Sequence, residues 1–246
     1  MVEPASILEP GQGGGRQGRC VGIEMQKVHF NQQEARRQGK RVYRVDIDFK
    51  NALNAMSQAA LWQMMRMFKI PEVDLLEQIC EGATVRLAPY DEESATITFN
   101  TGVAQGSITS PQLFNIFINA LLRMLTITGQ NEDISHGQGS AWQNGDNQQD
   151  ENDYQFNNIG FIDDISICAD TQEDMQKRLN VVQEFTAWCG MQINVKKAYL
   201  LVIDNDKKRR EQEPAPLLTI NGETLQAMTL DDACRYLGYW GTGTAI

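Results

Sequence analysis

The stretch that decides the fold is residues 159–169, IGFIDDISICA, in which two apolar segments flank a pair of adjacent acids. Strand-favouring residues on both sides of a polar tip predict a β-hairpin whose arms enter the core. Asp163 and Asp164 would stand at this tip, where a carboxylate needs either water or a cation. Aspartate is also favoured in tight turns for local reasons, so the pair alone leaves an ordinary turn as an alternative.

A second apolar strand is predicted over residues 41–49, RVYRVDIDF, and it also contains acids near its end. Its period-two alternation places Asp46 and Asp48 on one face. If this strand lies beside the hairpin, Asp48 joins Asp163 and Asp164. Hard divalent cations such as Mg²⁺ take oxygen ligands, and two such ions about 4 Å apart stabilise the attacking and leaving oxygens of an in-line displacement. The three carboxylates therefore indicate nucleotidyl transfer.

The rest of the chain alternates helical and strand patterns. Cap residues and turn signals divide it into further elements. In chain order, these are a helix through Leu61 and Phe68 that ends at Pro71, a second helix to about Cys80, two short strands over residues 84–98, a helix over 111–125, a helix between Thr171 and Gly190, strand segments near 191–193 and 198–203, a loop over 207–216, and a hairpin turning at Asn221 and Gly222. This order predicts an α+β fold of the split βαβ, ferredoxin-like kind.

Two segments have a composition that predicts little regular structure. Residues 1–20 are rich in Gly, Pro and Gln and predict a loose segment. Residues 129–157 are rich in Gln, Asn, Gly and Asp and predict a disordered acidic insertion. This insertion holds six acids and no Lys or Arg, so it carries −6 of the formal net charge of −10.

The charge pattern bears on the class of partner. A net charge of −10 argues against a nucleic-acid partner, because phosphate contacts need Lys and Arg. Cations nevertheless cluster in residues 36–44 and 207–210, outside the acidic insertion. A solvated face also explains such clusters, so both readings stay open.

Cysteine spacing and hydropathy exclude several other classes. The five cysteines lie far apart without a CxxC pair, and there are two histidines, which argues against a zinc site or a disulfide framework. The N-terminal residues MVEPASILEP lack a signal-peptide pattern, and no uninterrupted apolar stretch is long enough to cross a bilayer. We expect a soluble, intracellular protein of the cytoplasm or nucleus, with no membrane partner.

Five segments, in order along the chain, resemble the reverse transcriptases of non-LTR retrotransposons and group II introns. Residues 48–54, DFKNALN, resemble the first catalytic block, and residues 102–115, GVAQGSITSPQLFN, match the second block closely. Residues 161–164, FIDD, match the aromatic-x-Asp-Asp block. Residues 190–197, GMQINVKK, resemble the fourth block, and residues 236–238, YLG, resemble the primer-grip region.

The resemblance implies an RNA-directed DNA polymerase with a palm over residues 41–246, partial fingers or a loose segment over residues 1–40, and no thumb. Asp48, Asp163 and Asp164 would bind two Mg²⁺ or Mn²⁺ ions. The partners would be an RNA template, a DNA primer and deoxynucleoside triphosphates. The chain would be a fragment of a retroelement polyprotein with further domains.

The resemblance also assigns roles to other residues of the blocks. The Phe49 carbonyl would add an oxygen ligand to the metal site. Gln105 and Gly106 would contact the templating pair and the incoming nucleotide, where glycine lets the backbone approach closely. Lys197 would stabilise or protonate the leaving pyrophosphate. Residues 13–19, GGGRQGR, resemble the end of the fingers block, and a Gly/Arg linker explains them equally well.

Two departures from the family pattern keep alternatives open. Leu53 stands where the family usually carries the Phe or Tyr that excludes the ribose 2′-hydroxyl, and Asn54 replaces the more frequent Asp. An RNA-synthesising palm polymerase therefore stays open. So do an inactive relic that binds nucleic acid or a partner protein, and a metal-binding regulatory domain. Asp46 shares the strand face of Asp48, but the spacing to Ala52 and Asn54 favours Asp48 as the ligand.

Overall fold

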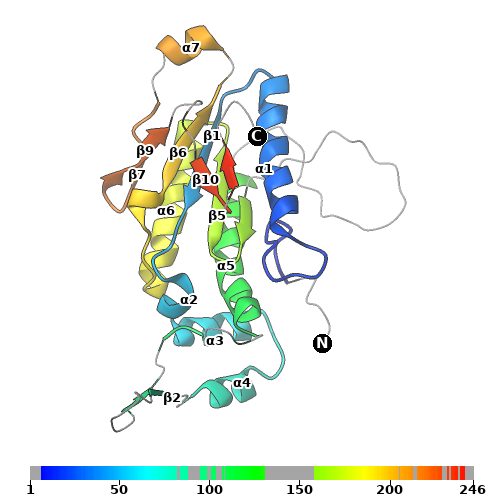
Figure 1. The fold of residues 1–246 in the computed structure, drawn as a ribbon, viewed down its shortest axis with the longest axis vertical. Coiled ribbons are helices and arrows are strands. Elements are labelled where there is room, and N and C mark those ends of the chain that lie inside the picture. The colour runs from blue at the N-terminus through cyan, green and yellow to red at the C-terminus, as the bar shows by residue number, and fades with distance from the viewer. Residues whose placement is uncertain are drawn as a thin grey trace, which may run out of the picture.

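A mixed sheet of five strands organises the molecule (Figure 1). The computed structural model describes residues 7–81, 84–87, 95–98, 101–103, 107, 109–130, 158–204, 206–212, 215–228, 232, 234–237 and 239–241. Across the sheet the strands are β4 (Asn158–Phe161), β5 (Asp164–Ala169), β1 (Val42–Ile47), β6 (Tyr199–Ile203) and β9 (Gln226–Met228). Neighbouring strands are antiparallel except β6 and β9, which are parallel.

The chain order confirms the predicted split βαβ arrangement. Strand β1 leads through α5 (Ser110–Gln130) to the β4–β5 hairpin, and α6 (Gln172–Cys189) then leads to β6. In the sheet, β1 lies between β5 and β6. The two crossover helices are therefore free to pack side by side on one face of the sheet, as Figure 1 shows.

The face covered by α5 and α6 is the apolar core. Val45 and Ile47 of β1 are buried there, together with the aromatic rings of Phe117 and Phe185, whose centroids lie 5.6 Å apart. Helix α6 confirms the helix predicted between Thr171 and Gly190, and it buries an apolar stripe: Met175, Leu179, Val182, Phe185 and Cys189. Gly190 ends this helix at a φ of 75°, as predicted.

The opposite face of the sheet is polar along β1 and is covered by α1 (Val21–Arg37) and the hairpin β10 (Cys234–Tyr236) and β11 (Tyr239–Gly241). Val28 of α1, Ile159 of β4 and Tyr236 of β10 form a small apolar cluster there. The Tyr236 hydroxyl donates to the Ile159 carbonyl at 3.4 Å. The C-terminal hairpin is thereby fixed against the sheet.

The remaining elements agree largely with the sequence. They are α2 (Ala52–Ala55), α3 (Gln58–Met67), α4 (Val73–Cys80), β2 (Thr84–Leu87), β3 (Ala95–Thr98), the short 3-10 helix η1 (Val195–Lys197), β7 (Thr219–Ile220) and β8 (Glu223–Thr224). The β7–β8 hairpin turns at Asn221 and Gly222, with φ values of 53° and 76°. An Asn-Gly pair favours a hairpin turn in which both residues have positive φ. The predicted hairpin turn at Asn221 and Gly222 is therefore confirmed.

Three expectations about local structure were wrong, and one helix was not predicted. Helix α1 was not predicted, because its buried face is largely polar and lacks an apolar spacing: Glu24, Lys27, Asn31 and Gln32. Helix α7 (Lys207–Gln212) replaces the predicted loop, since the Asp206 carboxylate caps it by accepting from the Lys208 and Arg209 amides. Ile193 forms an isolated bridge instead of a strand. Helix α5 continues to Gln130, so the proposed insertion begins in a helix; residues 131–157 lie outside the described residues.

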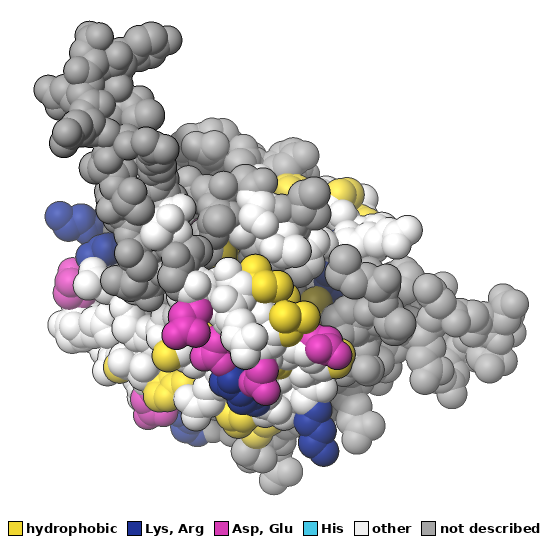
Figure 2. Space-filling view, turned by 90° about the horizontal axis from the view of Figure 1, so that it is seen from below, with side chains coloured by type: hydrophobic (Ala, Val, Ile, Leu, Met, Phe, Trp, Pro, Cys, Tyr) yellow, Lys and Arg dark blue, Asp and Glu magenta, His cyan; other side chains and the backbone are white. Residues whose placement is uncertain are grey.

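The end of the molecule formed by α3 and α4 shows acidic and apolar side chains beside one another (Figure 2). Arg66 pairs there with Asp74 at 2.8 Å and with Glu77. Leu75 and Ile79 of α4 are exposed. An arginine already shared by two carboxylates has little positive charge left for a phosphate, so this cluster does not suit a nucleic-acid backbone. No described helix is long and apolar enough to span a membrane.

A buried arginine ties together the two chain segments that flank residues 131–157. Arg178 of α6 is 1% exposed and donates to the Asp174 carboxylate at 3.1 Å. It also donates to the Asn158 side-chain oxygen at 3.3 Å and to the Leu125 carbonyl at 3.5 Å. Gly129 passes so close that a Cβ there would lie 2.1 Å from the Arg178 Nη2. The C-terminal turns of α5 and the start of β4 are thereby joined through α6.

Replacing Arg178 with Met is expected to lower the free energy of unfolding by about 3–5 kcal/mol, because it leaves the buried Asp174 charge without its partner. Urea denaturation measures this loss. Lys177→Met, at the exposed neighbouring position, is the matched control and should change stability by less than about 0.5 kcal/mol. Equal stability of the two variants would show that the Arg178 contacts contribute little.

Candidate active site

The sheet brings the three predicted acids to one place. Strands β1 and β5 pair with Ile47 opposite Ile165, so Asp48, the next residue, falls beside Asp164. Phe161 pairs with Asp164 and closes the hairpin around Ile162 and Asp163. The expectation that the strand ending at Asp48 lies beside the Asp-Asp hairpin is therefore confirmed. The roles of Asp48, Asp163 and Asp164 as metal ligands remain a prediction.

The charges of these acids act on one another. Burial raises the pKa of the Asp163 carboxyl, and the negative charge of Asp48 raises it further. For Asp164, burial is again the largest cause, followed by the charges of Asp163, Asp48 and Asp46, and together they raise its pKa to about 6. A bound cation would favour the ionised forms of carboxyls that burial and neighbouring negative charges make difficult to ionise.

Asp48 is oriented by the segment between α6 and β6. Its Oδ2 accepts a hydrogen bond of 2.9 Å from the Asn194 side-chain amide, and its carbonyl accepts one of 2.8 Å from the Asn194 backbone. Lys197 Nζ lies 3.9 Å from the same carboxylate, and its side chain is largely exposed. The structure thus brings Lys197 to the acidic cluster. Asn194 was missed as a site residue, although it lies in the block that contains Lys197.

The backbone carbonyl of Phe49 points away from the segment that pairs with it. Phe49 forms an isolated antiparallel bridge with Ile193, flanked by the Lys50 to Gln192 and Asn194 to Asp48 backbone bonds, both of 2.8 Å. In such a pair the two facing residues turn their own N–H and C=O groups outward. The Phe49 carbonyl therefore points away from Ile193, toward the side on which β5 and its turn lie.

Asp46 is paired with an arginine, and this distinguishes its role from that of Asp48. Arg44 donates to both carboxylate oxygens of Asp46, at 2.9 Å and 2.7 Å. The same guanidinium donates to the Ser166 hydroxyl at 3.1 Å and lies 5.1 Å from the centroid of the Tyr236 ring. Asp46 thus belongs to a structural ion pair beneath the C-terminal hairpin. This agrees with the choice of Asp48 as the ligand.

The predicted nucleotide-contacting residues are only partly described. Leu53 of α2 is half-buried against the core, and its carbonyl accepts a 3.0 Å hydrogen bond from the Val103 amide. The block that contains Gln105 and Gly106 therefore starts directly beside Leu53. Gln105 and Gly106 themselves lie outside the described residues.

The chemistry of the donors fits a hard divalent cation. The cluster offers carboxylate oxygens from Asp48, Asp163 and Asp164 and a carbonyl oxygen from Phe49, and oxygen ligands suit Mg²⁺ and Mn²⁺. Burial and the neighbouring acids raise the pKa values of Asp163 and Asp164, so a bound cation would favour their ionised forms. Within the described ranges, however, no group of three or more His, Cys, Asp or Glu side chains has the arrangement of a metal site.

Residues 3–240 match the family model for "Reverse transcriptase (RNA-dependent DNA polymerase)". The chain belongs to the reverse transcriptase family. This match covers the described acidic cluster, the β4–β5 hairpin and the segments that resembled the family in sequence. The predicted family and the predicted α+β palm fold are confirmed.

Similar proteins include two retrotransposon polyproteins. The Pol polyprotein of the type-2 element R2DM from Drosophila melanogaster is 24% identical over 205 residues, which cover 82% of this chain and 18% of that protein. The Pol polyprotein of the type-1 element R2 from Nasonia vitripennis is 23% identical over 209 residues, covering 83% and 19%. The chain thus spans under one fifth of the length of these two relatives.

Among solved structures, an apo telomerase from Candida tropicalis, truncated from its C-terminal domain, shares the fold. It superposes with a TM-score of 0.58 at 11% identity and covers 80% of this chain and 37% of that structure. A likeness at this identity establishes the palm-like architecture of this reverse transcriptase chain.

Proposed function

We propose that this chain is the catalytic palm of a retroelement Pol polyprotein and copies RNA into DNA by two-metal-ion nucleotidyl transfer. The observation that supports this most directly is the meeting of Asp48 with Asp163 and Asp164 at the end of the central strands. In this proposal residues 1–40 contribute to the fingers and residues 41–246 form the palm. An RNA template, a DNA primer and further polyprotein domains are the partners.

In the proposed reaction, the residues of this chain hold the metal ions and compensate charge on the leaving group. When bound, two ions of Mg²⁺ or Mn²⁺ lower the pKa of the primer 3′-hydroxyl and neutralise the triphosphate. Asp48, Asp163 and Asp164 hold these ions, and Asn194 keeps the Asp48 carboxylate in place. Lys197, beside Asp48, supplies positive charge or a proton to the leaving pyrophosphate. Positioning and electrostatic stabilisation are the main sources of rate in such transfers.

In this polymerase, Gln105 and Gly106 contact the templating pair and the incoming nucleotide. The support is indirect: the segment before them is held against Leu53 by the bond from the Val103 amide. Phe49 supplies its carbonyl as a further metal ligand, as the backbone orientation allows.

Primer extension by the full chain tests the function. Incubation with poly(rA)/oligo(dT), dTTP and Mg²⁺ or Mn²⁺ should lengthen the primer, and EDTA should stop the reaction. Extension that continues in excess EDTA would contradict metal-dependent catalysis. Absence of extension with either ion would contradict polymerase activity of this chain and favour a role in binding nucleic acid or a partner protein.

Leu53 makes relaxed sugar selection a specific expectation, and it keeps RNA synthesis as the second candidate function. We expect Leu53→Phe to raise the ratio of kcat/KM for dTTP over UTP by about tenfold or more, because a larger side chain crowds the ribose 2′-hydroxyl. Single-nucleotide incorporation on an rA template measures the ratio. Leu53→Met, which nearly preserves side-chain volume, should leave it unchanged; a ratio that is the same in all three proteins would place Leu53 away from the sugar.

A further inference from the structure

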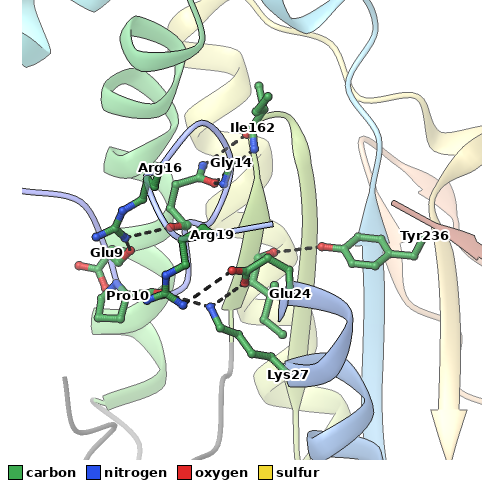
Figure 3. Close-up of polar contacts among 11 residues, drawn as sticks. Glu9, Pro10, Gly14, Arg16, Arg19, Glu24, Lys27, Ile162 and Tyr236 are labelled. Carbon is green, nitrogen blue, oxygen red and sulfur yellow. Dashed lines mark hydrogen bonds and ion pairs between the residues drawn. The ribbon is translucent and has the colours of Figure 1, made fainter. Parts of the chain in front are cut away.

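The segment before α1, residues 7–19, crosses the edge of the sheet at the catalytic hairpin (Figure 3). We call it the N-terminal strap. Gln12 forms a parallel bridge with Gly160 of β4. The Gly13 amide donates to the Gly160 carbonyl at 2.8 Å, and the Gly160 amide donates to the Gly11 carbonyl at 3.0 Å. The strap is therefore hydrogen-bonded to the outer strand of the hairpin that carries Asp163.

Glycines let the strap lie directly against the hairpin. A Cβ on Gly11 would lie 2.2 Å from the Asn158 carbonyl oxygen. A Cβ on Gly14 would lie 2.4 Å from the Ile162 amide nitrogen and 2.5 Å from its Cγ1. Contacts this short exclude a side chain at either position unless the hairpin moves. The glycines thus serve close backbone approach in addition to chain flexibility.

Two helices fix the strap in this position. Lys27 of α1 is paired with Glu24 at 2.6 Å and donates to the Pro10 carbonyl at 3.4 Å, as Figure 3 shows. Asn115 of α5 donates to the Gly14 carbonyl. Within the strap, Arg16 donates to the Gln12 carbonyl at 2.9 Å. The location of Gln12 is therefore set by packed helices on both of its sides.

Gln12 contacts the backbone of the catalytic turn with both ends of its amide. Its side chain is fully buried, and its Oε1 accepts from the Ile162 amide at 3.2 Å and from the Gly14 amide at 3.1 Å. Its Nε2 donates to the Ile162 carbonyl at 3.4 Å. One side chain thus bonds both backbone groups of Ile162, the residue directly before Asp163.

Ile162 needs such support because of its backbone conformation. Its φ is 59°, in the left-handed region that is unfavourable for an L-residue and least favourable for a β-branched side chain. A residue in this region persists where its surroundings hold it there. The conformation of Ile162 sets the direction in which Asp163 leaves the turn.

We propose that Gln12 is a positioning residue, whose buried amide holds the Ile162 backbone so that Asp163 and Asp164 face Asp48. This inference rests on the proposed polymerase function for its catalytic consequence. A glutamine suits the task because it carries a donor and an acceptor at the spacing of a peptide group. Met has a similar length and neither group. Glu keeps an acceptor but adds a negative charge beside the acids.

Amide hydrogen exchange on the full chain, without substrate, tests the contact itself. In Gln12→Met we expect the Ile162 amide to exchange at least about tenfold faster than in the wild type, because its acceptor is gone. The amides of Ile165 and Ile167, inside the β1–β5 pairing, should be unchanged. Gln26→Met, at an exposed position of α1, is the control and should match the wild type.

Single-nucleotide incorporation tests the consequence. We expect Gln12→Met to lower kcat by about 10- to 100-fold with little change in KM for dTTP, since a displaced carboxylate affects the reaction more than nucleotide binding. Gln12→Glu should keep the Ile162 amide protected and still lower kcat, so it carries the test if Gln12→Met does not fold.

The two readouts separate the inference from the proposed function. Unchanged Ile162 exchange in Gln12→Met overturns the inference, as does a lower melting temperature with unchanged kcat. A wild-type chain that extends no primer would count against the proposed function alone, because hydrogen exchange still decides whether Gln12 holds the turn.

Discussion

Asp163→Asn is expected to lower nucleotide incorporation by at least about 10³-fold, which corresponds to the several kcal/mol that metal-ion charge stabilisation contributes to such a transfer. Asparagine has nearly the same shape but lacks the charge that a divalent ion requires. Because burial and the Asp48 charge both raise the pKa of Asp163, the native state gains little from its ionised form. The variant should therefore be at least as stable as the wild type.

This combination of lost activity and retained stability distinguishes a functional acid from a structural one. Incorporation of one dTTP and thermal unfolding are measured on the same preparations. Asp170→Asn, at the far end of β5 from the turn, is the matched control and should retain wild-type activity. An Asp163→Asn protein with more than about a tenth of the wild-type rate would contradict the assignment, since tenfold corresponds to only 1.4 kcal/mol.

We expect Gly102→Val to destabilise the chain by roughly 3–5 kcal/mol and to abolish incorporation. The loss combines the cost of overpacking with the cost of placing a β-branched residue in the left-handed region. Gly102 has a φ of 74°. A Cβ there would lie 2.6 Å from the Leu53 carbonyl oxygen and from the Asn54 Cα, which are backbone atoms of α2. The Gly102 amide also donates to the Met56 carbonyl at 2.7 Å. A side chain at this position must push α2 away from the loop.

The matched control is Gly222→Val, in the β7–β8 turn. Gly222 has a similar φ of 76°, and nothing lies within 4 Å of a Cβ placed there. It should lose only the conformational cost, roughly 1–2 kcal/mol. Denaturant unfolding compares the two variants. Equal losses of unfolding free energy in the two variants would mean that the close approach of Gly102 to α2 does not contribute to stability.

The elements that the sequence predicted well are those whose burial follows a local apolar pattern. Strand β5 and the buried face of α6 are recognisable from apolar spacing alone, because each packs an apolar surface into the core. Helix α1 was not recognisable in this way. Its buried residues Glu24 and Lys27 form an ion pair, and in the sequence such charged residues resemble those of a solvated surface.

The acids of the candidate site were predicted, but the residues that hold them were not. The resemblance to reverse transcriptases selected Asp48, Asp163 and Asp164, and the strand register confirmed that they are neighbours. Asn194 and Gln12 bond to partners 146 and 150 residues away, which no local pattern reveals. The run of glycines around Gln12 was a usable signal, because glycine marks close backbone approach as well as looseness.

The most direct test of the account is a titration of the full chain with Mn²⁺, followed by electron paramagnetic resonance, for the wild type and Asp163→Asn. We expect saturable binding to the wild type and affinity at least about tenfold weaker in the variant, a difference of 1.4 kcal/mol or more. Equal Mn²⁺ affinity in both proteins would contradict the claim that Asp48, Asp163 and Asp164 form a common metal site.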